Sequence, residues 1–145
     1  MRHFLFAVAI GFAFIGGRTS QAALGDDADA IENVYGAMVR RHLFDDGTLG
    51  VWYHQPHDRY LHYVLFEKRV SVMEGCARVD GGKLSQAEIA RFLKLNTARG
   101  TKWAPAGSGS DECRLVRSDG ALEAITREVD NKPAVLVKRR KKLES

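Results

Sequence analysis

The alternation of apolar and polar positions over residues 27–43 predicts a first helix. Apolar side chains recur there at the spacing of an α-helix, at Ile31, Val34, Tyr35, Met38 and Val39. Asp26 or Asp27 can cap the start of this helix, where acidic side chains face the positive end of the helix dipole. We therefore expect a helix over about 27–43 with its apolar stripe in the core.

A second helix is predicted over about residues 85–96 by a sharper local signal. Ser85 and Glu88 have the spacing of a capping box, in which each side chain accepts a hydrogen bond from the other residue's backbone N–H. Leu84 and Ile89 have the spacing of a hydrophobic staple. We expect this helix to bury its apolar face against the rest of the domain.

Six further segments have the composition of β-strands. They cover about residues 49–54, 60–66, 70–76, 114–118, 121–129 and 134–137. The segment 60–66 has apolar side chains on both faces, which predicts a central or covered strand. Residues 121–129 fit either a strand or a helix, and we prefer a strand because turn residues bracket the segment.

These elements predict an α+β fold, with an antiparallel sheet of about five to six strands and two helices packed on it. The order is a helix followed by three strands, and then the same again, although no repeat of residues supports a duplication. The chain of 145 residues is within the usual size of one domain, and we assign 23–137 to a single globular domain.

The first 22 residues have the layout of a secretory signal peptide. A short basic start is followed by twelve uncharged, mostly apolar residues, Phe4–Ile15, and then by small residues at Ser20 and Ala22. A membrane-spanning helix needs about 20 apolar residues, so we prefer a signal peptide over residues 1–22, cleaved after Ala22 or Ala23. The protein is then expected to be secreted or periplasmic.

The charge of the chain is concentrated near its C-terminus. The formal net charge is +4, and loss of Arg2 and Arg18 with the signal peptide leaves 20 basic and 18 acidic residues. Five of the basic residues form one run, Lys138, Arg139, Arg140, Lys141 and Lys142. We expect 138–145 to be a basic, disordered tail, either simply solvated or in contact with an anionic surface such as phospholipid head groups. We expect no nucleic-acid partner, because the aromatic residues cluster at 52–66, remote from the cations.

Cys76 and Cys113 are the two cysteines of the chain. Secreted proteins fold in oxidising compartments, where paired cysteines usually form disulfides. We therefore predict one disulfide between Cys76 and Cys113, which would leave neither sulfur free to act as a nucleophile.

A cluster of metal-competent side chains marks the predicted hairpin between the strands at 49–54 and 60–66. It contains His54, His57, Asp58 and His62. Imidazole nitrogens suit zinc or copper, so the cluster is a candidate metal site. The alternative is a set of exposed hairpin histidines beside packed aromatic residues.

The function that these features favour is non-catalytic binding. The glycine–serine run 107–110 does not match the nucleophile elbow G-x-S-x-G, and no pair of carboxylates stands out for acid–base chemistry. We expect a small exported interaction protein whose partner is an unknown protein or envelope component, bound at sheet edges or hairpin tips. The alternatives are a metal-binding envelope protein that uses the histidine hairpin, and a small envelope hydrolase with an unrecognised site. No cofactor is expected apart from the metal of the first alternative.

Overall fold

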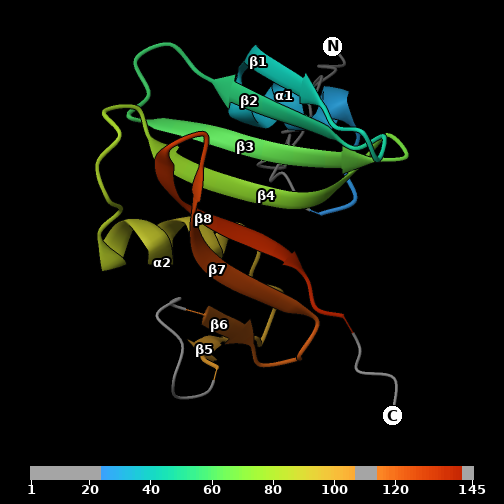
Figure 1. The fold of residues 1–145 in the computed structure, drawn as a ribbon. Coiled ribbons are helices and arrows are strands. Elements are labelled where there is room, and N and C mark those ends of the chain that lie inside the picture. Colours follow the sequence, from blue (N-terminus) through green and yellow to red (C-terminus); the bar gives the residue numbers. More distant parts are fainter. Residues whose placement is uncertain (1–23, 107–113, 142–145) are drawn as a thin grey trace, which may run out of the picture.

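The computed structural model of the protein describes residues 24–106 and 114–141. In this range the chain forms one eight-stranded antiparallel sheet and two short helices (Figure 1). The first half contains α1 (Ala28–Tyr35), β1 (Ala37–Leu43), β2 (Leu49–His54), β3 (Tyr60–Glu67) and β4 (Val70–Arg78). The second half contains α2 (Gln86–Lys94), β5 (Trp103–Pro105), β6 (Arg114–Arg117), β7 (Leu122–Val129) and β8 (Lys132–Arg139).

The expected count of five to six strands was wrong, because the two outermost strands were missed. The strand order is β1-β2-β3-β4-β8-β7-β6-β5, so β1 and β5 are the two edges of the sheet. An edge strand has one neighbour and little to bury, so its sequence lacks the apolar alternation of an inner strand. All seven residues of β1 are exposed, and β5 is three residues long.

The two halves of the chain have the same plan, a helix followed by a meander of four strands. The halves join through the antiparallel pair β4–β8, in which Gly75 lies opposite Leu136. The first strand of each meander, β1 or β5, therefore lies at an edge of the sheet. The fourth strand of each, β4 or β8, lies at the centre. The helix followed by three strands noted twice in the sequence thus becomes a helix followed by four strands, and this order of elements occurs twice.

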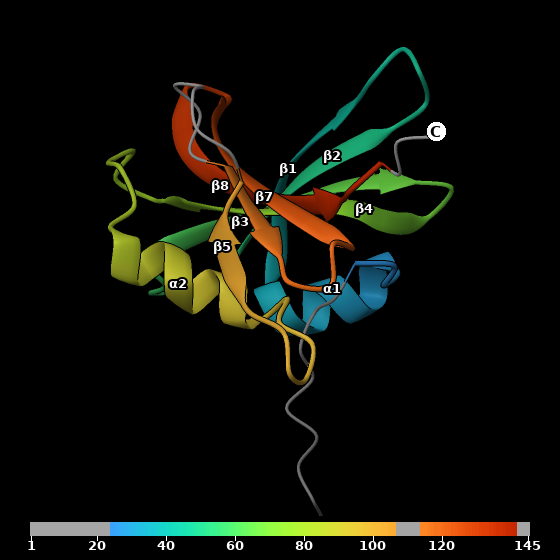
Figure 2. The ribbon, with the colours of Figure 1, turned by 90° about the horizontal axis from the view of Figure 1, so that it is seen from below.

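Both helices lie on the same face of the sheet, as Figure 2 shows. One buried cluster joins α1 to β2 and β3 and contains Ile31, Tyr35, Val51, Tyr53, Val64 and Phe66. A second joins α2 to β4, β7 and β8 and contains Cys76, Ile89, Phe92, Leu93, Leu122, Ala124, Val135 and Val137. A third lies on the face without helices and contains Trp52, Tyr63, Ala77, Ile125, Ala134 and Leu136.

The helix predicted over 27–43 was wrong in its second half. Asp27 caps α1 by accepting a hydrogen bond from the N–H of Ala30, but the helix ends at Tyr35. Gly36 then adopts φ 94°, and a Cβ atom at this position would lie 2.5 Å from the carbonyl oxygen of His54. The glycine lets the chain turn tightly against the end of β2 and continue as β1.

The second helix agrees with its prediction. The backbone N–H of Glu88 donates to Ser85 Oγ at 3.1 Å, and the N–H of Ser85 donates to Glu88 Oε1 at 3.0 Å. The preference for a strand over 121–129 is also confirmed, by β7.

The predicted disulfide was wrong, because Cys76 is a free, buried thiol. Its side chain points from β4 into the cluster beneath α2 and is 4% exposed. Cys113 lies outside the described residues. The α2 cluster is therefore held together by packing at this point.

The termini of the described chain differ in part from the sequence prediction. The predicted signal peptide, 1–22, lies outside the described residues. The predicted start of the tail at Lys138 was too early, because Lys138 and Arg139 belong to β8 and the N–H of Arg140 donates to the carbonyl oxygen of Ala121. Within the described ranges, neither helix is long and apolar enough to cross a membrane.

Candidate functional site

The four residues of the predicted metal site do not converge. His54 lies at the end of β2, where its Nε2 is 3.0 Å from the carbonyl oxygen of Asp58. His57 lies exposed in the following loop with φ 67°, whereas His62 is inside β3. The described part of the chain holds no group of three or more His, Cys, Asp or Glu side chains placed to bind a metal ion. The metal-binding alternative therefore gains no support from the structure.

His62 instead lies directly opposite Cys76 in the β3–β4 ladder. Both line a pocket of about 210 Å³ beneath α2, together with Asp58 and Glu88. Burial raises the pKa of the Cys76 thiol to about 12 and lowers the pKa of His62 to about 4. At neutral pH the pair is a neutral thiol beside a neutral imidazole, which lacks the thiolate that nucleophilic catalysis requires.

A buried polar network lies next to this pair. Tyr35 Oη donates to Glu74 Oε2 at 2.8 Å, and Ser71 Oγ donates to Glu74 Oε1 at 3.2 Å. Glu74 is fully buried, and this burial raises the pKa of its carboxyl group. The ring of Tyr35 stacks on that of His62 with centroids 4.1 Å apart. The network fixes α1 to the middle of the sheet, and its central carboxylate is fully buried, so we assign it a structural role.

The exposed edge strand β1 is the strongest candidate for a functional surface. Large apolar side chains on it and in the turn after it are open to solvent, with 49% of Met38, 57% of Val39, 68% of Leu43 and 40% of Phe44 exposed. Among the described strands β1 pairs with β2 alone, so one row of its backbone N–H and C=O groups faces away from the sheet. A long open edge with apolar side chains is a template for pairing with another extended chain.

On the helix face, β1 borders an apolar groove of about 680 Å³. Met38 and Leu43 of β1 form one wall, and the floor is made by β2 and β3 with Val51, Tyr53 and Phe66. The other wall is α1, whose Asp27, Asp29 and Glu32 line the rim. The groove thus offers apolar contact along the strand, but it is not free of cations, because Arg41 of β1, Lys68 and Arg69 also line it.

On the opposite face, β1 borders a smaller hollow of about 230 Å³ with a different character. Arg40 and His42 point to this side, because their β2 partners are Trp52 and Gly50. Asp130 also lines the hollow, but its Oδ2 accepts a 2.8 Å hydrogen bond from Trp52 Nε1. The two sides of β1 therefore differ in degree: the groove side presents Met38 and Leu43 with Arg41 between them, whereas the hollow side presents Arg40 and His42.

The other edge of the sheet is protected. β5 has three residues, and the last of them is Pro105, which has no backbone N–H to donate. Short edge strands and prolines are common means of preventing further strand pairing. The contrast with the seven-residue β1 indicates that this protein leaves one edge open and closes the other.

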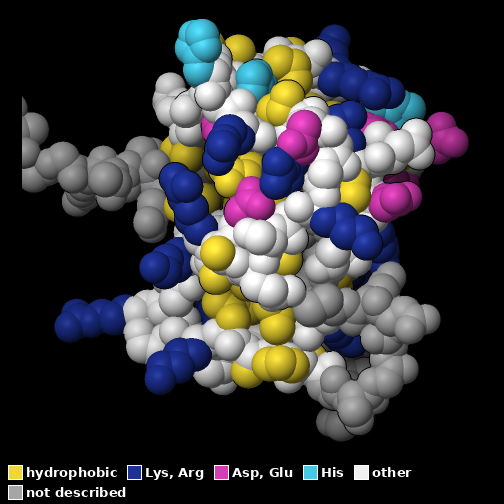
Figure 3. Space-filling view, turned by 90° about the vertical axis from the view of Figure 1, so that its left-hand side faces the viewer, with side chains coloured by type: hydrophobic (Ala, Val, Ile, Leu, Met, Phe, Trp, Pro, Cys, Tyr) yellow, Lys and Arg dark blue, Asp and Glu magenta, His cyan; other side chains and the backbone are white. Residues whose placement is uncertain are grey.

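The residues of the basic run are dispersed by the fold. Lys138 Nζ lies 3.5 Å from Glu123 Oε1, and Arg139 lines a separate cavity at the end of α2. Arg140 and Lys141 are exposed, and Lys142 lies outside the described residues. Figure 3 shows lysine and arginine side chains spread over one side of the molecule, with apolar side chains exposed between them. Contact of the run with an anionic surface stays a prediction.

Comparison with known proteins assigns no family. The chain matches no protein-family model and resembles no curated protein. It is similar to the crystal structure of a cysteine-rich secretory protein from Staphylococcus aureus subsp. aureus Mu50, with 14% identity and a TM-score of 0.48. The match covers 81% of this chain and 44% of that one, so the chain spans less than half of that protein's length. A likeness at this level carries no conclusion about function or compartment.

Proposed function

We propose that this chain is an exported, non-catalytic binding protein that accepts an extended segment of a partner protein along β1. The observation that carries the proposal is the open, seven-residue edge between an apolar groove and a cationic hollow. A segment lying beside β1 would bond its outward N–H and C=O groups and add a ninth strand to the sheet.

The two sides of β1 indicate the chemistry of the segment. Successive side chains of a strand point to opposite faces of its sheet. A strand added beside β1 would therefore alternate between the groove, next to Met38, Arg41 and Leu43, and the hollow, next to Arg40 and His42. We infer that the partner segment alternates apolar side chains with acidic ones.

A second copy of β1 is a poor occupant of this edge. Antiparallel pairing of two copies about Arg40, the centre of the strand, would place the two Arg40 side chains opposite each other, and pairing about Arg41 would do the same with the two Arg41 side chains. Like charges opposite one another destabilise strand pairing. The cationic edge suits an acidic partner instead.

Export rests on the sequence and is compatible with the described structure. Ser71 fixes the first described residues to the sheet, since Gly25 N–H donates to its carbonyl oxygen at 2.8 Å and its own N–H donates to Asp26 O at 2.9 Å. Cleavage after Ala22 or Ala23 would leave these contacts intact. The intact mass of the protein recovered from an exporting host tests this step, because an uncleaved N-terminus would contradict it.

Binding at β1 can be tested with a fluorescent nine-residue peptide in which valine alternates with glutamate. We expect saturable binding by fluorescence anisotropy, and loss of binding when alternate backbone amides are N-methylated. N-methylation removes the donors of strand pairing and leaves the side chains unchanged. Equal binding of the methylated peptide would contradict pairing at an edge.

Three variants locate the binding site. Arg40→Glu should weaken binding of the glutamate peptide and favour a peptide with lysine in place of glutamate, and Met38→Asp should weaken binding of both peptides. Lys102→Glu makes the same charge change beside the closed edge and serves as the control. Equal losses in Arg40→Glu and Lys102→Glu would show that only the overall charge matters.

A further inference from the structure

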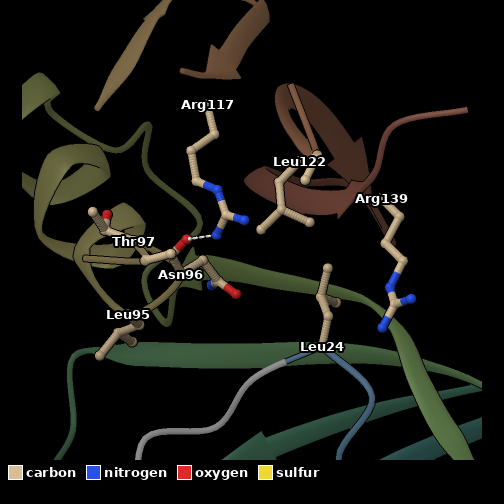
Figure 4. A pocket seen from close by; sticks show the side chains of 9 residues that line it. Leu24, Leu95, Asn96, Thr97, Arg117, Leu122 and Arg139 are labelled. Atoms are coloured by element: carbon tan, nitrogen blue, oxygen red, sulfur yellow. Dashed lines mark hydrogen bonds between the residues drawn. The ribbon is translucent and has the colours of Figure 1, made fainter. Parts of the chain in front are cut away.

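A second cavity lies at the end of α2, in the other half of the molecule from β1 (Figure 4). Its volume is about 460 Å³, within the usual range of small-molecule pockets. The lining comes from four parts of the chain: the N-terminal Leu24, the residues after α2, the β6–β7 region and β8. No aspartate or glutamate is among the described residues that line it.

Two arginines supply the charge of this cavity. Arg139 of β8 lines it and makes no ion pair within the described ranges. Arg117 of β6 is held in place by two bonds to Asp119, of 2.9 and 2.6 Å, and by a 2.8 Å bond to the carbonyl oxygen of Asn96. Three of its five N–H groups are engaged, which leaves one N–H on each terminal nitrogen. Asp119 balances the charge of Arg117, so Arg139 provides the net positive charge.

The buried amide of Asn96 is the second independent feature. Asn96 is 6% exposed, and its Nδ2 has no hydrogen-bond partner among the described residues. A buried donor without a partner costs free energy, so a position that keeps one calls for an explanation. Figure 4 shows the carboxamide between Arg117 and Leu24 with Oδ1 toward the cavity, so Nδ2 reaches the cavity after a half-turn about the terminal torsion, which exchanges the two atoms.

The rest of the cavity wall is apolar. Leu24, Leu95 and Leu122 surround the polar groups, and Figure 4 shows the side chains of Leu24 and Leu122 extending toward each other across the cavity. A purely inorganic anion would leave these side chains unused. Ligand pockets typically combine such walls with a few placed polar groups that orient the ligand.

We propose that this cavity binds a small amphiphilic anion. Its carboxylate or phosphate group would accept hydrogen bonds from Arg139, Arg117 and the amide of Asn96, and its short hydrocarbon part would lie against the three leucines. An anionic acceptor would satisfy Nδ2 of Asn96 once the carboxamide has made that half-turn, and no described residue of the lining carries a carboxylate that would repel it.

The test is calorimetric titration of the purified protein with octanoate, octyl phosphate and octylammonium, and with inorganic phosphate as the headgroup alone. We expect binding of one or both amphiphilic anions at one site, no binding of octylammonium, and much weaker binding of inorganic phosphate. Which of the two anions binds identifies the headgroup. Failure of both anions, equal binding of octylammonium, or equal binding of inorganic phosphate and octyl phosphate would overturn the proposal.

Variants place the ligand in this cavity. Arg139→Gln should reduce affinity about tenfold or more, since it removes a charge-assisted contact. Lys141→Gln makes the same change of charge two residues along the chain and should leave affinity within twofold. Equal effects of these two changes would overturn the site. Asn96→Leu removes the unbonded donor, so it should fold at least as well as the parent, by thermal unfolding, while binding the anion more weakly; unchanged affinity would overturn the role of the amide.

Discussion

Tyr35 at the end of α1 donates a 2.8 Å hydrogen bond to Glu74 in the fourth strand, across 39 positions of sequence. The bond is buried, and the acceptor is a carboxyl group with no access to water. It joins the first helix to a strand at the centre of the sheet. Removing it should therefore affect the whole domain.

We predict that Tyr35→Phe lowers the free energy of unfolding by about 1–3 kcal/mol, because the Oε2 of Glu74 loses its donor in a buried place. Tyr53→Phe is the matched control, since Tyr53 belongs to the same buried cluster and no hydrogen bond is found for its hydroxyl in the described structure. Urea unfolding of both variants measures the difference. Equal losses would mean that packing of the ring, rather than the bond, holds α1.

The buried imidazole of His62 should make stability depend on pH. Burial lowers its pKa to about 4, while the charge of Asp58 raises it and that of His54 lowers it. An unfolded histidine titrates near pH 6.5, so the folded state takes up the proton less readily. The contribution of His62 to the free energy of unfolding is therefore fully present above pH 6.5 and is lost as the pH falls toward 4. The loss is at most about 3 kcal/mol.

His62→Phe tests this, because a phenyl ring can stack on Tyr35 but does not titrate. We expect the variant to lose less stability than the parent between pH 7.5 and 4.5 in urea unfolding. Glu74 acts in the opposite direction, since its raised pKa favours folding as the pH falls, but it is present in both proteins. His57→Asn removes an exposed histidine and should lose as much stability as the parent between pH 7.5 and 4.5. If its loss is instead as small as that of His62→Phe, the burial of His62 is not the cause of the pH dependence.

Gly36 should tolerate no side chain. Alanine there would adopt φ 94° and place its Cβ 2.5 Å from the carbonyl oxygen of His54, so we predict a loss of about 2 kcal/mol or more. Gly47→Ala is the control, because Gly47 has φ 84° but no atom within 4 Å of the added Cβ. It should cost about 1 kcal/mol from the backbone alone. Similar losses by thermal unfolding would show that the close approach to β2 is not limiting.

The buried thiol of Cys76 should be unreactive in the native protein. With Cys113→Ser as the background, Cys76 is the single cysteine, and its burial raises its pKa to about 12. We predict that iodoacetamide at pH 8 alkylates it far more slowly in the folded protein than in urea, as measured by mass spectrometry. Fast alkylation of the folded protein would show that the core under α2 opens readily.

Much of the inner sheet could be read from the sequence, whereas its edges could not. The segments at 60–66 and 134–137 lie inside the sheet, and two-sided burial left long apolar runs in their sequences. β1 buries nothing, so residues 37–43 keep a spacing that also suits a helix. Gly36 directly after Tyr35 was the available signal, because a glycine in this position commonly ends a helix.

The candidate sites were harder to predict, because contact between distant segments creates them. Asn96, Arg117 and Arg139 follow a helix, end a short strand and close the last strand, and no spacing in the sequence relates them. In the sequence, Arg139 is distinguished only by its place in the basic run 138–142. The disulfide failed for a related reason: a count of cysteines does not show that Cys76 points into the core beneath a helix.

The junction of β4 and β8 has a consequence for valency. A dimer of one helix-and-meander unit, paired through its fourth strand, would reproduce the strand order of this sheet, and its two edges would be identical. Such a dimer would offer two equal docking edges and could cross-link its partners. Because both units belong to one chain, the edges are free to differ, and here β5 is short and ends in proline while β1 is long and open. If a partner binds at β1 as proposed, the single-chain arrangement offers it one open edge among the described strands, so it would gain no avidity from a second, identical edge on the same molecule.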